Sequence, residues 1–446
     1  DVVATLLDGG LAFVDLLHAA AARGAALLPL NVRLTARELA FQLAESAAKL
    51  LVCEAGRLAH LAREAAALVD ARARPERIEL VANARAALED RIAPSAPAYG
   101  ERGPVDSRQT HALVYTSGTT GTPKGALLSQ RALFWSAIGS GMRLGLAPAD
   151  RWLVCMPLYH VGGFSILLRC TLFGSSAILH ERFDAERVDR ALDEDGVTLV
   201  SLVPTMLARV LDARGARRAP RGLRCVLLGG GPAPRELVDR ARSRGFPVAT
   251  SYGLTEASSQ VATQHPTLAR SRGCGGLRPL VGTEIAIVDG SREPLHGRAG
   301  EIIVRGPTLM SGYQKRPAET ARALQDGWLY TGDVGAIDAT GALEVFERRR
   351  DLIISGGENV YPAEVERVLA EHPAVAEAAV AARADDEFGQ RAIAWVVAKR
   401  GERLDALELR RFCAERLAAY KIPVEFRNAE TLPRNELGKL LREKLA

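Results

Sequence analysis

The 446-residue sequence has few cysteines, no long apolar run and no concentrated block of one charge. Its six cysteines are widely spaced and form no C-x-x-C pair, so we expect neither a disulfide framework nor a structural zinc site. No apolar stretch reaches the length of a membrane span, and no signal peptide is visible. These absences lead us to expect a protein of the reducing cytoplasm. The chain begins at Asp1 rather than at methionine, so we expect the natural start to be missing.

The charge pattern argues against a nucleic-acid partner. The formal net charge is +5, but the arginines are scattered, whereas a nucleic-acid binder would show a basic stripe. The tight cluster Arg348-Arg349-Arg350 is followed directly by Asp351. A mildly basic chain with 48% hydrophobic and 25% charged residues fits a globular protein that binds small anionic ligands. The sequence leaves a homo-oligomer open.

Alternating apolar and amphipathic segments predict a layered α/β fold. Helices are expected at residues 11–22, 35–43, 58–73, 129–142, 205–213 and 234–244, and strands at 50–52, 111–115, 197–203, 224–228 and 247–251. Short strands at 284–288, 301–304 and 343–346 indicate a small β-rich part at about 280–347.

The arginine cluster precedes a compact segment of different texture. Helices are predicted at residues 362–371 and after Asp405, and strands at 374–381 and 392–398. Asp405 and Glu408 resemble a capping box that opens the second helix. We therefore predict a large α/β domain over residues 1–349 and a small α+β domain over residues 350–446.

The most informative segment is T-S-G-T-T-G-T-P-K-G at residues 116–125, directly after the strand predicted at 111–115. Its three glycines let the backbone bend and present N–H groups, and five hydroxyls and a lysine add donors. The segment is not a Walker loop, because Pro123 stands where that pattern needs glycine. A mobile surface loop is the alternative, but this density of donors favours a polyphosphate-binding loop.

Other polar clusters fit either an ordinary turn or a ligand site. A carboxylate such as Glu256, after the strand predicted at 247–251, could hold Mg²⁺, and Tyr252 could stack on a base. The backbone at residues 229–232 would let a flat ring approach closely, and Asp333 could accept both hydroxyls of a ribose. Two further clusters lie at residues 355–359 and 433–439.

The order and spacing of these motifs resemble the adenylate-forming superfamily of acyl-CoA synthetases, peptide-synthetase adenylation domains and luciferases. The matching motifs are Y-T-S-G-T-T-G-T-P-K-G from Tyr115, M-P-L-Y-H-V-G-G from Met156, S-Y-G-L-T-E from Ser251, G-E-I-I-V-R-G-P from Gly300, W-L-Y-T-G-D from Trp328, R-R-R-D-L-I-I-S-G-G-E-N-V-Y-P-A-E-V-E from Arg348 and L-P-R-N-E-L-G-K from Leu432. The resemblance covers essentially the whole chain.

Within this superfamily the chain is most similar to the o-succinylbenzoate–CoA ligases of menaquinone biosynthesis. The runs that carry this similarity are S-I-L-L-R from Ser165, V-P-T-M-L-A-R-V-L from Val203, L-L-G-G-G-P-A-P from Leu227, G-F-P-V-A-T-S-Y-G-L-T-E from Gly245 and L-A-A-Y-K-I-P from Leu417. Two departures are visible. A few dozen N-terminal residues usual in the family are absent, and Glu347 and Arg350 replace the residues usual around the hinge.

The resemblance implies binding sites for ATP, Mg²⁺ and CoA. The residues expected to bind the β- and γ-phosphates are Thr116, Ser117, Gly118, Thr119, Thr120 and Lys124. Those expected around the adenine are Gly229, Gly230, Gly231, Pro232 and Tyr252, and those at the ribose are Asp333 and Arg348. Gly356 and Gly357 are also expected to contact a cofactor. The expected catalytic residues are Lys439, Thr255, His160 and Glu256, the last as the Mg²⁺ ligand.

Lys439 and the S-G-G-E-N loop both lie in the small domain. If each serves a different half-reaction, both cannot face the site at once, so the resemblance implies a mobile small domain that rotates about the position of Arg350. For an acid with a second carboxylate, the pocket must supply a donor or cation. His160, Ser165 and Arg169 are the candidates, although Arg169 could equally be a helix-surface arginine.

The implied activity is ATP-dependent acyl-CoA ligation through an acyl-adenylate, with o-succinylbenzoate as the expected acid. CoA ligation of a fatty, aryl or malonate-type acid remains open, and so does a free-standing adenylation enzyme that loads a carrier protein. A luciferase-like oxygenase is disfavoured by the subfamily motifs. A non-catalytic nucleotide-binding module is disfavoured because Glu256, Arg348 and Lys439 are all present.

Overall fold

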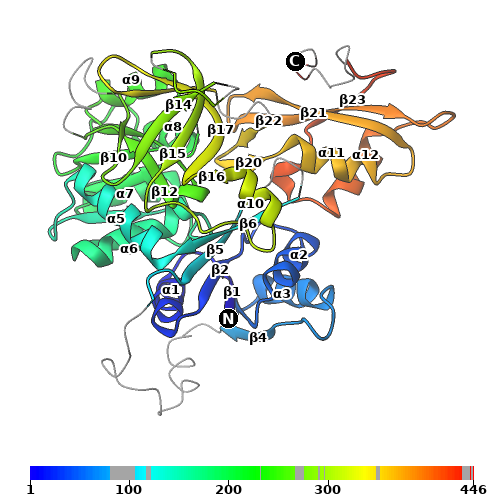
Figure 1. Ribbon diagram of the computed structural model, residues 1–446, viewed down its shortest axis with the longest axis horizontal. Helices are drawn as coiled ribbons and strands as arrows, with labels where there is room; N and C mark the ends of the chain where they lie inside the picture. The colour runs from blue at the N-terminus through cyan, green and yellow to red at the C-terminus, as the bar shows by residue number, and fades with distance from the viewer. Residues whose placement is uncertain are drawn as a thin grey trace.

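Two largely parallel sheets, a smaller antiparallel sheet and a separate C-terminal sheet make up the computed structural model of the chain (Figure 1). The structure describes residues 1–80, 106–116, 122–231, 233–266, 276–289, 292–295, 297–347 and 352–433, together with Arg442 and Leu445. Within these residues, no helix combines the length and the apolar character that crossing a membrane would require.

The N-terminal sheet has the strand order β4-β3-β1-β2-β5-β6 and is parallel except for its last pair. Its strands are β1 (Val2–Leu6), β2 (Ala26–Pro29), β3 (Leu50–Glu54), β4 (Glu76–Leu80), β5 (Thr110–Thr116) and β6 (Lys124–Ser129). Its connecting helices are α1 (Leu11–Arg23), α2 (Ala36–Ser46) and α3 (Arg57–Ala67). At the start of α2, Thr35 and Glu38 form a full capping box, with Thr35 N donating to Glu38 Oε2 at 2.8 Å.

The loop predicted to bind phosphate joins two strands of a β-hairpin. The sequence analysis places this loop between a strand and a helix, but β6 intervenes and pairs antiparallel with β5. Lys124 is the first residue of β6. The next helix, α5 (Gln130–Leu144), begins after Ser129, whose hydroxyl accepts from the backbone N–H of Ala132 at 3.1 Å. Residues 117–121 lie outside the described part of the chain.

The second sheet has the order β13-β12-β11-β10-β9-β7-β8, and its strands are parallel from β8 to β11. Its strands are β7 (Arg151–Val154), β8 (Ser176–Leu179), β9 (Leu199–Leu202), β10 (Cys225–Leu228), β11 (Val248–Leu254), β12 (Ser259–Thr263) and β13 (Arg278–Pro279). Its helices are α6 (Val161–Phe173), α7 (Ala185–Glu194), α8 (Pro204–Arg214) and α9 (Arg235–Ser243), and a 3₁₀ turn, η1 (Thr255–Ala257), follows β11.

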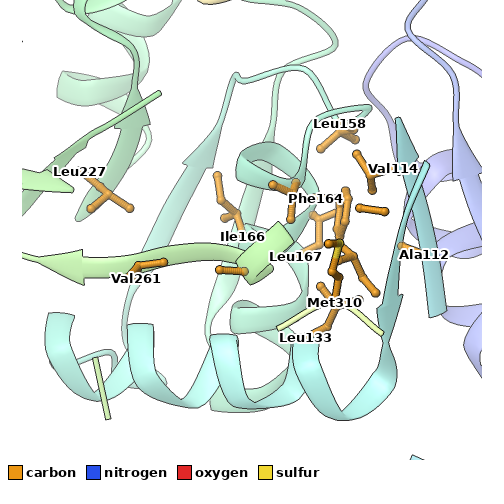
Figure 2. Close-up of a cluster of buried hydrophobic side chains, with 14 of the residues drawn as sticks. Ala112, Val114, Leu133, Leu158, Phe164, Ile166, Leu167, Leu227, Val261 and Met310 are labelled. Atoms are coloured by element: carbon orange, nitrogen blue, oxygen red, sulfur yellow. The ribbon is translucent and has the colours of Figure 1, made fainter. Parts of the chain in front are cut away.

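Helix α6 fills the space between the two parallel sheets, and this explains why it is apolar on several sides. Figure 2 shows Phe164, Ile166 and Leu167 of α6 among Leu133 of α5, Val114 of β5 and other apolar side chains. Gly163 lets this helix start close to the preceding loop, because a Cβ there would overlap the carbonyl oxygen of Pro157. The buried core thereby fixes where the first turn of α6 lies.

The predicted β-rich part is an antiparallel sheet of order β14-β15-β17-β16, with β18 also paired to β17. Its elements are β14 (Glu284–Val288), β15 (Gly300–Arg305), α10 (Pro317–Ala323), β16 (Leu324–Gln325), β17 (Trp328–Ile337) and β18 (Leu343–Glu347). The long strand β17 carries the T-G-D motif to the edge of the second parallel sheet, where Tyr252 OH donates to Asp333 Oδ2 at 2.7 Å.

The C-terminal sheet has the order β20-β19-β22-β21, with β23 parallel to β22. Its elements are β19 (Ile353–Ser355), β20 (Glu358–Val360), α11 (Pro362–Ala370), β21 (Val375–Asp385), β22 (Gly389–Ala398), α12 (Ala406–Ala414), a 3₁₀ turn η3 (Ala419–Lys421) and β23 (Glu425–Asn428). Figure 1 shows these segments, drawn in orange to red, above α2 and α3. Their apolar side chains form a core of their own. The predicted boundary at Arg350 lies outside the described residues.

The predicted α/β architecture is confirmed, and three further local corrections join that at β6. The helix expected at residues 58–73 ends at Ala67. The strand expected at 247–251 continues to Leu254, so most of the S-Y-G-L-T-E motif is strand rather than turn. Asp405 caps α12 through the backbone N–H of Leu407 at 2.9 Å, so no capping box with Glu408 is formed.

Candidate active site

A cavity of about 200 Å³ opens where the carboxyl ends of β9, β10 and β11 meet the first turn of α6. Parallel α/β sheets bind ligands at this end of their strands. The small domain contributes Leu352, Gly357, Asn359 and Tyr361 to the lining of the cavity. The cavity-lining residues predicted from the sequence are Thr116, His160, Gly229, Gly230, Thr255, Glu256, Asp333 and Gly357.

Glu256 is a buried carboxylate that fits a magnesium ligand. Its Oε1 accepts a hydrogen bond from Tyr313 OH at 2.8 Å, and the backbone N–H of Met310 donates to its carbonyl at 2.8 Å. Among the described residues, no cluster of three metal-binding side chains surrounds it. One carboxylate suits Mg²⁺ here, because this ion usually takes one or two carboxylates and fills its shell with phosphate and water.

Tyr252 supports Asp333 instead of lining the cavity. Its ring is buried, and its hydroxyl donates to Asp333 Oδ2 at 2.7 Å. The backbone N–H of Asp333 also bonds to Thr331 Oγ1 at 3.1 Å. The tyrosine thus orients the carboxylate expected at the ribose. Stacking of its ring on adenine stays a prediction.

His160 and Glu358 connect the cavity, near the start of α6, with the small domain. His160 precedes α6, and its Nε2 lies 3.2 Å from Glu358 Oε2. Tyr159 OH donates to Glu358 Oε1 at 3.1 Å, and Arg33 and Asn31 of the large domain each reach the same carboxylate at 3.3 Å. The S-G-G-E-N loop is thereby anchored to two segments of the large domain, residues 31–33 and 159–160.

The ionised form of Glu358 is strongly favoured in this position. Burial raises the pKa of its carboxyl, but the nearby His160 and Arg33 charges and the hydrogen bonds from His160 and Tyr159 lower it to about 2. Burial also raises the pKa of the Tyr159 hydroxyl, and the Glu358 charge adds to that effect. Tyr159 therefore acts as a neutral hydrogen-bond donor to a permanently charged carboxylate.

Arg169 of α6 is a fully buried cation that lines the same cavity. It is 1% exposed, its Nη2 donates to Ser259 Oγ at 3.3 Å, and its guanidinium lies 5.4 Å from the ring centre of Trp152. Burial lowers its pKa to about 10. Within the described residues no carboxylate pairs with it, and its Nε has no hydrogen-bond partner. The helix-surface alternative for Arg169 is thus excluded.

A second cavity, of about 330 Å³, lies between the two domains on the far side of Tyr159 and Glu358. Gly356 lines this cavity, whereas Gly357 lines the first, so the two glycines mark where the cavities adjoin. Three arginines line the second cavity, Arg33, Arg182 and Arg209, and so do three carboxylates, Asp8, Glu181 and Glu387. Arg209 is ion-paired with Glu387 at 2.7 Å, and Arg33 reaches Glu358 at 3.3 Å. A cavity at a domain interface is a usual place for a ligand.

Several predicted site residues are not brought into the cavity by the described structure. Lys124 lies with its Nζ 5.4 Å from the ring centre of Tyr313, and Gly231 approaches Ile354 of the small domain. The residues outside the described part of the chain are Ser117, Gly118, Thr119, Thr120, Pro232, Arg348 and Lys439. Of the six cysteines, Cys274 also lies outside it, and the five described ones are free and buried.

The sequence analysis missed Glu358, Arg33 and Ser259 as members of the site. Glu358 belongs to a motif that was identified, but its partners are more than 190 residues away along the chain. Ser259 follows the S-Y-G-L-T-E motif closely, and only its contact with Arg169 reveals its place. No signal in the sequence marks Arg33, whose role depends on how the domains meet.

Comparison with known proteins agrees with this geometry. The family model of AMP-binding enzymes matches residues 1–314, and the model of the AMP-binding enzyme C-terminal domain matches residues 364–439. A 2-succinylbenzoate–CoA ligase of Geobacillus kaustophilus (strain HTA426) is 41% identical over 445 residues, covering 100% of this chain and 87% of that protein.

Two solved structures of o-succinylbenzoate CoA synthetase (MenE) from Bacillus subtilis are also similar. A double mutant bound with its product analogue OSB-NCoA has a TM-score of 0.89, and the complex with the acyl-adenylate intermediate OSB-AMP has a TM-score of 0.69. Each is 38% identical, and the match covers 100% of this chain and 88% of that one. The predicted resemblance is confirmed, and the chain belongs to the AMP-binding enzyme family.

Proposed function

We propose that this protein is a 2-succinylbenzoate–CoA ligase that consumes ATP and forms an acyl-adenylate on the way to the thioester. The succinyl carboxylate attacks the α-phosphorus of ATP and pyrophosphate leaves. The sulfur of CoA then attacks the acyl carbon, and AMP leaves as the thioester forms. Mg²⁺, held at Glu256, would neutralise phosphate charge during the first step. The partners of the enzyme are then small molecules, namely the acid, ATP and CoA, and its place is the cytoplasm.

The observation that carries the choice of acid is the buried guanidinium of Arg169. An arginine without a carboxylate partner inside a protein is costly, and an incoming carboxylate would repay that cost. 2-Succinylbenzoate has two carboxylates, of which only the succinyl one is activated. We assign the ring carboxylate to Arg169, with Trp152 and Ser259 holding the guanidinium in place. Fatty acids and simple aryl acids offer no such second anion.

The orientation of the small domain suits the second half-reaction, in which the acyl group is transferred to CoA. Gly357 and Asn359 of the S-G-G-E-N segment line the first cavity. The chain also aligns better with the product-analogue complex of the Bacillus subtilis enzyme than with its acyl-adenylate complex. In this orientation the second cavity, with Arg182 and Arg209 in its lining, is the proposed entry of CoA.

A competition assay tests the acid. The protein is mixed with ATP, Mg²⁺, CoA and equal amounts of 2-succinylbenzoate, benzoate, a medium-chain fatty acid and malonate, and thioesters are identified by mass spectrometry. We expect 2-succinylbenzoyl-CoA to dominate. Dominance of another thioester would refute the assignment of the acid and leave a CoA ligase, whereas acyl-adenylate without any thioester would point to carrier-protein loading.

A variant tests the role of Arg169. Arg169→Gln should lower kcat/KM for 2-succinylbenzoate by roughly 100-fold, because an ion pair inside the cavity is lost. The matched control is Arg240→Gln, which removes an arginine that bonds to Asp212 away from both cavities. Equal losses in the two variants would show that Arg169 has no special role.

A further inference from the structure

Gln260 is a buried amide whose hydrogen-bonding capacity is unused. The side chain is 4% exposed, and within the described structure neither its Nε2 nor its Oε1 has a hydrogen-bond partner. Buried amides are almost always hydrogen-bonded, so each exception needs a reason. Gln260 also lines the first cavity, next in sequence to Ser259, which contacts Arg169.

The local backbone is built to hold this part of β12 firmly. Ser258 and Ser259 both have positive φ, at 57° and 102°. Ser136 Oγ donates to the carbonyl of Ser258 at 2.6 Å, and Ser258 Oγ donates to the carbonyl of Thr308 at 2.8 Å. Gly253 on β11 accommodates the tight turn, because a Cβ there would overlap the carbonyl oxygen of Ser259.

A β-bulge changes the direction of the side chains at this point. The pairing of β11 with β12 shifts between Tyr252 and Gly253, so that Tyr252 opposes Ala262 and Gly253 opposes Gln260. Neighbours in a regular strand face opposite sides of a sheet, yet Ser259 and Gln260 both line the cavity. Bulges of this kind re-aim side chains beside binding sites.

From these observations we propose that Gln260 is a specificity-determining residue that donates a hydrogen bond from Nε2 to the ketone oxygen of the acid. This inference rests on the proposed function. The ketone and the ring carboxylate of 2-succinylbenzoate are ortho to each other, so a ligand whose carboxylate meets Arg169 brings its ketone to the neighbouring residues. The terminal torsion of glutamine is soft and lets the amide turn towards the ligand.

Two truncated acids separate the two contacts. 2-(3-Carboxypropyl)benzoate replaces the ketone by a methylene group and keeps both carboxylates, whereas 3-benzoylpropanoate keeps the ketone and lacks the ring carboxylate. Each acid and 2-succinylbenzoate are compared by kcat/KM in the wild type, in Gln260→Met and in Arg169→Gln. Methionine matches the size of glutamine and removes only its hydrogen-bonding atoms.

We expect the wild type to prefer 2-succinylbenzoate over the methylene analogue by roughly 10- to 100-fold, because a site built to hydrogen-bond a substrate group rejects the analogue that lacks it. Gln260→Met should abolish this preference and keep the preference for the ring carboxylate. Arg169→Gln should abolish the preference for the ring carboxylate and keep the preference for the ketone. Because Gln260→Met removes an unpaired buried amide, the melting temperature of the ligand-free protein should stay the same or rise.

Gln264→Met is the matched control. Gln264 is also buried and lies four residues after Gln260. Its Oε1 accepts a hydrogen bond from Arg242 Nη2 at 3.0 Å. This variant should lower the melting temperature and keep the ketone preference. The inference is overturned if Gln260→Met retains the wild-type preference for the ketone. It is also overturned if kcat/KM for all three acids falls equally in this variant and its melting temperature is lower. A wild type that does not use 2-succinylbenzoate at all would overturn the proposed function as well.

Discussion

The ammonium group of Lys421 lies 2.6 Å from Oε1 of Glu38, so a residue of the small domain is ion-paired with the first turn of α2 in the large domain. A second carboxylate, Glu364 of α11, lies 2.8 Å from the same ammonium group. Lys421 is only 4% exposed. Burial lowers the pKa of Lys421, but the two carboxylates outweigh it and raise the pKa above its usual value.

Glu38→Gln should weaken the domain orientation seen here. Glutamine at this position can still complete the capping box with Thr35, so α2 is preserved while the charge facing Lys421 is lost. We expect CoA transfer from pre-made acyl-adenylate to slow by roughly tenfold, the effect of about 1.4 kcal/mol. Pyrophosphate release should stay normal. Glu284→Gln, which breaks an exposed pair with Arg305, serves as the control, and an equal effect there would contradict the prediction.

Lys421→Met should destabilise the protein and make its stability depend on pH. Removing the cation leaves the carboxylate of Glu364 buried and unpaired, which costs about 3–5 kcal/mol of unfolding free energy. Burial already raises the pKa of Glu364. A group with a raised folded-state pKa stabilises most below its unfolded pKa, and this contribution is lost as the pH rises. The deficit measured by urea unfolding should therefore shrink between pH 8 and pH 5. A deficit independent of pH would argue against this cause.

Glu358→Gln should affect CoA transfer and spare adenylation. The ionised carboxylate holds Arg33, Tyr159 and His160 together across the domain interface, and the amide cannot replace its charge. Single-turnover assays of the two half-reactions would measure the difference. Equal loss of both would show that Glu358 only supports folding.

The same carboxylate makes a prediction about pH. Because its pKa is lowered to about 2, its stabilising contribution is complete above its unfolded value of 4.5 and is lost only as the pH falls towards 2. The pH profile of CoA transfer should contain no inflection from Glu358 between pH 5.5 and pH 9. An inflection in that range that disappears in Glu358→Gln would contradict this.

Lys439→Ala should separate the half-reactions in the opposite sense. The resemblance of the L-P-R-N-E-L-G-K motif to the adenylate-forming enzymes predicts that this lysine acts in adenylation, where it would neutralise charge on the α-phosphate and acyl oxygens. Acyl-adenylate formation should fall by orders of magnitude, whereas thioester formation from pre-made acyl-adenylate should be largely preserved. Both steps can be followed by mass spectrometry of the intermediates, and a parallel loss would refute the assignment.

Local patterns in the sequence were sufficient for most elements, because apolar periodicity and capping residues act over a few positions. The capping residue Thr35 and the proline that opens α8 lie where such rules place them. Strand β6 was missed because its six residues follow a loop whose glycines and hydroxyls obscure any alternation. The helix predicted at residues 58–73 was too long. The residues after Ala67 still include alanine and arginine, which favour helix, so their composition does not mark the end of α3.

The chemistry of the site depended on contacts that no short pattern encodes. Arg169 stands in an apolar helix and looked equally like a surface residue until Trp152 and Ser259 were found around it. The hydrogen bond from Tyr252 to Asp333, which the β-rich sheet brings to its hydroxyl, could not be predicted from the sequence. Both outcomes depend on how separate sheets meet, which is a property of the tertiary structure.

The capping box of α2 has a consequence for how readily the domains exchange partners. Glu38 Oε2 is already held by Thr35, so the oxygen that accepts Lys421 is immobilised before the small domain arrives. Fixing a flexible glutamate costs about 1.5–2 kcal/mol of conformational entropy. Here formation of the capping box of α2 already includes that cost. If the small domain rotates between the half-reactions, docking at this contact has only the lysine left to order, and the contact would form and break with a small entropic penalty.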